Sequence, residues 1–295
     1  MAAKLALIAS VLALAFSIAS CAWGGEAPDE PRKLKADPAQ EYYVYFPKNF
    51  DAKRTYYVFV AVHDQGGTGQ GASGWAKFAD DGQCIVLGPT FKGIYQLPSE
   101  GAGEKLRSIL RELAKEYKIE LKVFLTGYGT GAQFAHRFAL ELPHLVLGCA
   151  AHSPNTWSTP DTKARGVPFL ITCGAEDRQG DRLGQAQKFV QDLTAKKFKV
   201  DSKWIPNFGH VFSDAARSAT EDFYFTQVTG MDKADRAKAL DELTVAKYRL
   251  EDGRYAEAAN LATKILSAKP SGIFVEKANA IMAQVEEAGN SRLAK

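Results

Sequence analysis

Two side chains in the second half of the sequence have the types needed to move a proton. Asp177 follows the apolar run "PFLITC", and His210 follows the last strand-like run of the chain. A carboxylate that orients an imidazole makes a general base. Spacing favours Asp177 over its neighbours Glu176 and Asp181, and the preceding Gly209 favours a functional position for His210 over a place in a surface loop.

The segment "KVFLTGYGTGAQFAHRFAL", residues 122–140, reads as an apolar strand, a turn with three glycines and an amphipathic helix. Turns that present a nucleophilic serine in this setting have the form G-x-S-x-G. This chain has Gly127-Tyr128-Gly129-Thr130-Gly131, with Gly129 at the serine position. Glycine tolerates the strained backbone of such a turn, so the turn can persist without a reactive oxygen. A shift of frame to Thr130 would place the bulky Tyr128 where a small residue is required.

Strand-like and helix-like runs alternate around these segments. The strand-like runs are Tyr42–Phe46, Tyr56–His63, Cys84–Gly88, Val123–Thr126, Leu145–Ala151, Phe169–Cys173 and Val200–Ile205. The helix-like runs are Gly103–Tyr117, Thr130–Glu141, Gln185–Lys196 and Ser213–Gln227. Continuous apolar strands separated by helices predict a doubly wound α/β fold, with a mostly parallel sheet covered on both faces. Functional groups of such sheets gather at the carboxyl ends of the strands.

A turn, then an acid, then a histidine, each at a strand end, is the chain order of a hydrolase triad. Together with the run "VAVHDQGG" at residues 60–67, this order makes residues 42–227 resemble the α/β-hydrolase superfamily. The closest resemblance is to secreted esterases of the feruloyl-esterase and polyhydroxybutyrate-depolymerase type. It implies that Asp177 is the triad acid, His210 the base and Gly129 the nucleophile position. It also implies an oxyanion hole made by the backbone amides of Gln65 and Thr130.

Other polar residues near these motifs have plainer interpretations. Asp64 stands where the oxyanion loop of the family has glycine, and its charge would disfavour an oxyanion unless it points away. We expect His63 to hold its loop and His136 to be a packed or solvated helix residue. Ser153 is expected to be exposed at the same rim without a strained turn, which makes it a poor nucleophile. Four aromatic residues could line an aromatic or sugar pocket, or serve packing alone: Trp75, Tyr95, Trp157 and Phe208.

The N-terminus has the pattern of an export signal. "MAAKLALIASVLALAFSIASC" has one lysine, an apolar run of about fifteen residues and then small residues. The run is too short for a comfortable membrane span. Its end resembles a bacterial lipobox, which predicts lipidation of Cys21 after a signal peptide over residues 1–21; cleavage after Ala22 is the alternative. We expect an exported protein of the cell envelope, a periplasmic or outer-membrane lipoprotein or otherwise a secreted protein, with a flexible tether over residues 22–39.

The composition changes at the end of an α/β domain that we place at residues 40–230. Residues 231–295 carry no strand signal and show two amphipathic helices around Gly253, followed by a further helix. The spacing of Gly253, Tyr255, Ala258, Leu266 and Pro270 resembles one tetratricopeptide repeat. One repeat cannot bury its own face, so it must pack on the main domain, on a partner or on its own third helix.

The net charge of +3 and the absence of a lysine or arginine run argue against nucleic-acid binding. Cys84, Cys149 and Cys173 lie in or beside apolar runs without metal-ligand spacing, and we interpret them as buried free thiols, with a disulfide between two of them as the alternative. We expect no metal and no cofactor.

Without the serine oxygen, acyl-enzyme chemistry is closed. We therefore expect a membrane-anchored protein that binds a small or polymeric ester- or acyl-type ligand without efficient turnover. The alternatives are a weak ester or acyl hydrolase that uses an activated water or another nucleophile, and a protein-interaction module formed by the C-terminal helices.

Overall fold

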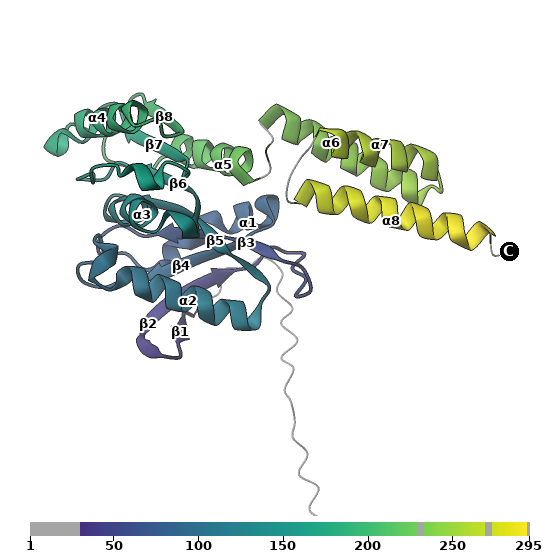
Figure 1. Ribbon diagram of the computed structural model, residues 1–295, viewed down its shortest axis with the longest axis horizontal. Coiled ribbons are helices and arrows are strands. Elements are labelled where there is room, and N and C mark those ends of the chain that lie inside the picture. Colours follow the sequence, from purple (N-terminus) through teal and green to yellow (C-terminus); the bar gives the residue numbers. More distant parts are fainter. Residues whose placement is uncertain (1–29, 229, 231–232, 269–272, 294–295) are drawn as a thin grey trace, which may run out of the picture.

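An eight-stranded sheet forms the centre of the α/β domain (Figure 1). The computed structural model describes residues 30–228, 230, 233–268 and 273–293. The strands are β1 Arg32–Leu34, β2 Asp37–Tyr45, β3 Tyr56–Val62, β4 Ile85–Thr90, β5 Ile119–Tyr128, β6 Val146–His152, β7 Phe169–Gly174 and β8 Val200–Ile205. Their order is β1-β2-β4-β3-β5-β6-β7-β8; β2 is antiparallel to β1 and β4, and the other neighbours are parallel.

Alternate side chains of the central strands enter two separate cores. Val58, Val60 and Val62 of β3 belong to one core, whereas Phe59 and Ala61 belong to the other. Successive residues of a strand point to opposite faces of the sheet, so a strand buried on both faces reads as a continuous apolar run. This explains why "YYVFVAV" shows no polar alternation.

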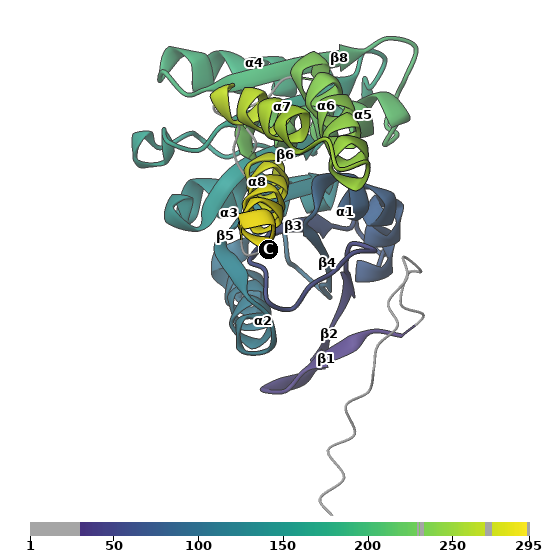
Figure 2. The same cartoon turned by 90° about the vertical axis from the view of Figure 1, so that its right-hand side faces the viewer.

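Helices cover both faces of this sheet (Figures 1 and 2). The first core lies under α2 Ala102–Glu116, α3 Thr130–Glu141 and α4 Arg182–Ala195, and the second lies under α1 Ala76–Gly82 and α5 Asp214–Val228. The predicted doubly wound, mostly parallel fold is therefore confirmed. Because β3, β5, β7 and β8 run in the same direction, their carboxyl ends meet at one edge, where the residues singled out above are placed.

The predicted N-terminal boundary of the domain is wrong. Residues 32–34 and 37–39, assigned to the tether, belong to β1 and β2, which pair at the edge of the sheet. Arg32 is held there by Glu116 and Tyr117 at the end of α2. The signal peptide and Cys21 lie outside the described residues. The short helix α1 was not foreseen, because seven residues give little periodicity to read.

Three further helices follow α5: α6 Lys233–Glu251, α7 Tyr255–Ser267 and α8 Ile273–Leu293. They share a small core of their own, which includes Ala246, Ala262 and Phe274. Of the three packing arrangements considered from the sequence, packing on the third helix is seen, and Arg236 of α6 also contacts α5 of the main domain. The likeness to a tetratricopeptide repeat stays a prediction.

Cys84, Cys149 and Cys173 are buried free thiols, as predicted. Among the described residues no helix is long and apolar enough to cross a membrane. The same part of the chain contains no cluster of three side chains suited to hold a metal ion.

Candidate functional site

Asp177 and His210 meet at the carboxyl edge of the sheet, although 33 positions separate them in the sequence. Asp177 follows β7 and is buried to 1% exposure, while His210 follows β8 and is partly exposed. The distance from His210 Nδ1 to Asp177 Oδ2 is 2.9 Å. This bond orients the imidazole and leaves its other nitrogen, Nε2, for a second partner. The alternative acid Glu176 is exposed instead, and Asp181 lies at the start of α4.

A buried arginine that the sequence analysis did not single out completes the acid's surroundings. Arg182 begins α4, and its Nη1 lies 3.3 Å from Asp177 Oδ1. The same guanidinium donates to the side chains of Asn155 and Gln179. A buried carboxylate needs such partners to remain charged. Arg182 therefore stabilises the ionised Asp177 from the side opposite to His210.

The glycine turn forms a sharp strand-to-helix elbow between β5 and α3. Gly129 has φ 55° and ψ −117°, a conformation that side-chain-bearing residues rarely adopt. Its neighbours pack closely: a Cβ on Gly127 would lie 2.3 Å from the Gly131 backbone, and one on Gly131 would lie 2.2 Å from Val62 O. All three glycines are therefore fitted to the turn, and Gly129 occupies the position from which a nucleophile would project.

The carboxylate of Asp64 fills the space above Gly129. An ideal Cβ on Gly129 would lie 2.3 Å from Asp64 Oδ1, 2.6 Å from Cγ and 2.8 Å from Oδ2. Oδ1 also accepts a 2.7 Å hydrogen bond from the backbone N–H of Thr130, the first residue of α3. The positive end of the helix dipole adds to this attraction. From the sequence, we expect the charge of Asp64 to disfavour an oxyanion unless the side chain points away from the elbow. In the structure, the carboxylate points toward the elbow.

The two backbone amides assigned to the oxyanion hole therefore have different surroundings. The Thr130 N–H donates its hydrogen bond to the Asp64 carboxylate, an anion supplied by the protein itself. Gln65 is exposed in a tight turn closed by a hydrogen bond from Gly67 N to Asp64 O. Its role as the second donor stays a prediction.

His63 holds the loop that presents Asp64. Its Nε2 accepts a hydrogen bond from the Phe91 N–H at 3.0 Å, so the proton sits on Nδ1, which donates to Asp64 O at 2.6 Å. Burial lowers the pKa of His63 and favours this neutral tautomer. The Tyr95 hydroxyl donates to the carbonyl of His63. The structural role expected for His63 is the one observed.

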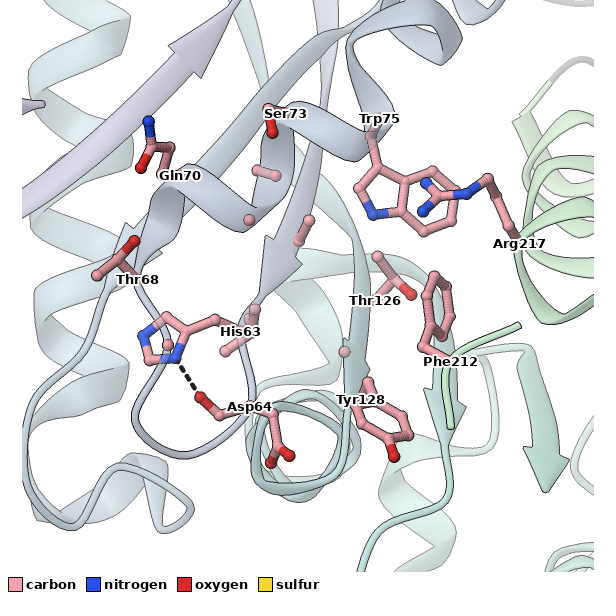
Figure 3. A pocket seen from close by; sticks show the side chains of 16 residues that line it. His63, Asp64, Thr68, Gln70, Ser73, Trp75, Thr126, Tyr128, Phe212 and Arg217 are labelled. Atoms are coloured by element: carbon pink, nitrogen blue, oxygen red, sulfur yellow. Dashed lines mark hydrogen bonds between the residues drawn. The ribbon is translucent and has the colours of Figure 1, made fainter. Parts of the chain in front are cut away.

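A pocket of about 530 Å³ opens beside this loop (Figure 3). Asp64 and Tyr128 lie at one end of it, and Trp75 and Arg217 lie at another, with the Arg217 guanidinium 4.6 Å from the Trp75 ring centre. The Tyr128 ring lies between the pocket and His210, since its centre is 4.8 Å from the centre of the imidazole. Asp64 thus lines the pocket, whereas His210 does not.

Tyr128 is placed to donate a hydrogen bond at this end of the pocket. Within the described residues its hydroxyl has no hydrogen-bond partner, and burial together with the negative charges of Asp64 and Asp177 raises its pKa. A raised pKa keeps the phenol protonated at neutral pH.

Two expectations about other polar residues are corrected or refined. Ser153 is buried to 3% exposure instead of exposed, it has φ 46°, and its hydroxyl faces Cys173 Sγ at 3.5 Å. His136 is fully buried and neutral: Nδ1 donates to Ala132 O, and Nε2 accepts from Ser158 N. Burial lowers the pKa of His136 to about 3.

Of the four aromatic residues proposed for a pocket, one lines the pocket beside Asp64. Trp75 does so, whereas Tyr95 packs against His63 and Trp157 stacks on Phe189. Phe208 is 40% exposed on the loop before His210. The aromatic composition alone could not separate these environments, because each depends on loop packing.

The chain is similar in sequence to one known protein family. The model of the family described as the dienelactone hydrolase family matches residues 95–244, just over half of the 295 residues. That range includes the elbow, Asp177 and His210, and it ends within α6. No curated protein sequence matches the chain.

Several solved esterases and hydrolases have a similar fold. A thermostable esterase is 18% identical with a TM-score of 0.53, over 62% of this chain and 56% of the esterase. A mutant feruloyl esterase module from Clostridium thermocellum, complexed with sinapinate, is 13% identical with a TM-score of 0.53, over 66% of this chain and 86% of the module. Poly(aspartic acid) hydrolase-1 from Sphingomonas sp. KT-1 is 18% identical with a TM-score of 0.52, over 66% and 97%. At these identities the likeness shows the fold alone.

Proposed function

This chain belongs to the dienelactone hydrolase family of α/β hydrolases, and we propose that it is an exported member that binds an ester- or acyl-type ligand without efficient turnover. One observation carries the proposal: the Asp64 carboxylate lies where a nucleophile side chain would project from position 129, and it takes the Thr130 N–H. The site therefore lacks the oxygen that attacks a carbonyl and has one amide fewer to stabilise the product of that attack.

Both deficits act on the same chemical step. An acyl-enzyme requires a nucleophile at the elbow, and its tetrahedral intermediate requires hydrogen-bond donors for the oxyanion. Loss of a triad nucleophile costs about 10⁶-fold in kcat, and the Asp64 carboxylate adds electrostatic repulsion of a developing oxyanion. Binding in the neighbouring pocket needs neither group.

The ligand class follows from the family and from the fold neighbours. The solved structures of similar fold include a ferulic acid esterase and a feruloyl esterase module complexed with sinapinate. Aromatic acyl esters are thus the first probes to use. Trp75, Phe212 and Ala72 supply apolar walls in the pocket, and Gln70 and Thr68 supply polar groups.

The purified chain should be assayed with methyl ferulate and p-nitrophenyl butyrate. We expect no hydrolysis at ordinary serine-hydrolase rates and no labelling by a fluorophosphonate probe, because position 129 carries no hydroxyl. We also expect methyl ferulate to raise the melting temperature, since a ligand that binds the native state stabilises it. Rapid hydrolysis that His210→Ala abolishes would sink the proposal.

A second candidate function is slow hydrolysis through an activated water. The intact pair of Asp177 and His210, 2.9 Å apart, favours it, because an oriented imidazole can take a proton from water. Residual catalysis of about 10³–10⁴ over the uncatalysed rate is typical of a site that retains only binding and oxyanion stabilisation. Slow hydrolysis lost in His210→Ala, without probe labelling, would favour this candidate; labelling of Ser153 would reveal an unrecognised nucleophile.

Export and membrane anchoring through Cys21 form part of the proposal. They rest on the signal-like sequence of residues 1–21. We expect the protein to fractionate with membranes when expressed with this segment, and Cys21→Ser to release it from them. Equal membrane association of the two forms would contradict lipidation at Cys21.

A third candidate places a protein partner on the C-terminal helices. A groove of about 890 Å³ runs between α6 and α8 and includes Leu243, Leu250 and Ile281, with Leu240 43% exposed at its side. Truncation at Asp232 would then abolish association with the partner while leaving ligand binding in the α/β domain intact.

A further inference from the structure

Exposed large apolar side chains gather on one of the C-terminal helices, α6. Val245 is 42% exposed, Tyr248 is 64% exposed and Leu240 is 43% exposed. They are three of the seven such side chains in the part of the chain that the structure describes, and all three belong to this one helix. Single exposed apolar residues are common on protein surfaces, whereas a group of them on one element marks an interaction site.

Val245 and Tyr248 belong to the side of α6 that faces away from the other two helices. The opposite side of α6 is buried in the core that it shares with α7 and α8. Lys238, Asp241, Val245, Tyr248 and Asp252 are all exposed and follow one another at intervals of three, four, three and four positions. This alternation places them in one line along a helix, and it is the spacing along the seam of two paired helices. We call these five residues the outer face of α6; none of them lines the groove between α6 and α8.

The charged residues of the outer face lack ionic partners within their own chain. Lys238, Asp241 and Asp252 form no ion pair among the described residues, whereas Lys247, on a neighbouring side of α6, pairs with Glu251. Lys238 stands at one end of the row and Asp252 at the other. The row is therefore complementary in charge to a copy of itself that is turned end for end.

Two copies of α6 that are antiparallel about Val245 bring these opposite charges together. Lys238 lies seven positions before Val245 and Asp252 seven positions after it, so each Lys238 faces the partner's Asp252. Asp241, four positions before Val245, comes close to the partner's Tyr248, whose hydroxyl can donate to the carboxylate. A parallel arrangement would instead place each charged residue beside its own copy, which is repulsive.

We propose that the outer face of α6 binds a second copy of this chain, with the two α6 helices antiparallel about a two-fold axis at Val245. Such an interface is isologous, since both copies use the same residues. It goes beyond the proposed function, because the partner occupies a C-terminal helix and not the pocket beside Asp64. Since α6 leads away from the α/β domain (Figure 1), antiparallel helices carry the two domains to opposite ends of the dimer.

The apolar and charged parts of this interface have different effects. Val245 and Tyr248 lose contact with water on association, which supplies the favourable free energy. The paired charges set the antiparallel direction and the register, because exposed ion pairs add little affinity. A contact of one helix per copy is small for a protein interface, so we expect a dimer that dissociates on dilution.

Sedimentation equilibrium of the purified full chain over a range of concentrations tests the charges. Lys238→Asp and Asp252→Lys should each raise the Kd of the dimer about tenfold, because the symmetry turns two attractive pairs into repulsive ones. The double variant with both changes restores opposite charges and should return the Kd to within about threefold of the wild-type value. A second change would not repair a damaged fold, so this rescue separates pairing from stability.

Substitutions at Val245 test the position of the axis. Val245→Lys places two positive charges against each other and should give a monomer. Facing Cα atoms of helices packed about 8–10 Å apart lie about 4–6 Å from each other, within the range of a disulfide, so Val245→Cys should give a covalent dimer under mild oxidation. Leu121 of β5, which is 54% exposed, is the matched control: Leu121→Lys should leave the dimer intact, and Leu121→Cys should not cross-link.

A chain that stays monomeric up to about 0.1 mM would overturn the proposal and leave the outer face to a different protein. A dimer that persists in Val245→Lys would place the contact on another surface and would equally overturn it. So would a double variant of Lys238 and Asp252 that fails to restore the dimer. None of these results bears on the proposed function, which is judged on acyl esters.

Discussion

At the elbow, a side chain from one loop fills the volume that another residue leaves empty. Gly129 adopts φ 55°, and the carboxylate of Asp64 occupies the space of its absent side chain. The two residues therefore have to be considered as a pair. A side chain added at Gly129 would collide with the Asp64 carboxylate, and a smaller residue at position 64 would leave the space above Gly129 unfilled.

The single substitution Gly129→Ser should not create an esterase. Its Cβ would meet Asp64 Oδ1 at 2.3 Å, and the backbone strain alone costs about 1–3 kcal/mol. The double variant Asp64→Gly with Gly129→Ser removes the conflict and frees the Thr130 N–H. We expect p-nitrophenyl butyrate hydrolysis and fluorophosphonate labelling in the double variant alone.

Two controls complete this experiment. Asp64→Gly by itself should remain inactive, since it has no nucleophile, and the active double variant should lose activity with His210→Ala. If Gly129→Ser alone were fully active, the arrangement of Asp64 over Gly129 would be wrong.

At the scale of elements, helix N-termini position the acidic residues of the site. Thr130, at the start of α3, holds Asp64 through its N–H, and Arg182, at the start of α4, holds Asp177 through its side chain. The loop after β3 is thereby fixed to α3, which follows a different strand, whereas the loop after β7 is fixed to α4, the helix into which it leads. The orientation of the site depends on these cross-connections.

Arg182→Met should destabilise the fold more than the loss of an exposed ion pair. Asp177 would keep His210 as a partner but lose the guanidinium while remaining 1% exposed. Removal of one partner from a buried pair typically costs about 3–5 kcal/mol. Urea unfolding measures the change. Lys188→Ala, which breaks an exposed pair with Asp192 on the same helix, should cost less than about 1 kcal/mol.

Buried neutral histidines connect helices and strands, and they should make the fold sensitive to acid. His136 of α3 and His152 of β6 are at most 2% exposed, and burial lowers the pKa of each from 6.5 to about 3. Between these values the unfolded chain binds more protons than the native one, so stability falls as the pH falls. Each histidine contributes a slope of up to about 1.4 kcal/mol per pH unit.

His136→Gln should therefore weaken this pH dependence. The free energy of unfolding, measured by urea titration at pH 6.5 and 5, should fall less in the variant than in the wild type. His144→Gln is the matched control, because His144 is exposed and its replacement should leave the slope unchanged. Equal slopes for the wild type and His136→Gln would show that His136 does not carry the effect.

At the scale of the whole molecule, the α/β domain and the C-terminal helices have separate cores. The helices α6 to α8 bury Ala246, Ala262 and Phe274 among themselves. Contacts to the domain include the Arg236 guanidinium, 3.7 Å from the centre of the Phe225 ring and 3.6 Å from Asp222. A separate core is the usual mark of a unit able to fold alone.

A chain that stops after Gly230 should keep the α/β fold. We expect one cooperative thermal transition and native-like near-ultraviolet dichroism, because the two cores of the sheet remain complete. A chain that stops after Thr220 loses Phe223 and Tyr224 from the second core and should fail to fold. If the first truncation also failed, the helices would be an essential part of the domain.

The sequence by itself determined the alternation of the central strands and the helices between them, though not β1 or α1, together with the mostly parallel sheet and the approach of Asp177 to His210. These follow from local apolar patterns and from the rule that parallel strands end at a common edge. Likewise, the glycine turn predicted the elbow, since its strained backbone is a local property.

Only the tertiary structure decided what occupies the elbow. Asp64 and Thr130 are 66 positions apart, and the direction of one carboxylate depends on how two loops pack. The same holds for the burial of Ser153 and for β1 at the sheet edge. A side-chain orientation of this kind is set by contacts between distant segments, and local sequence patterns carry no information about such contacts.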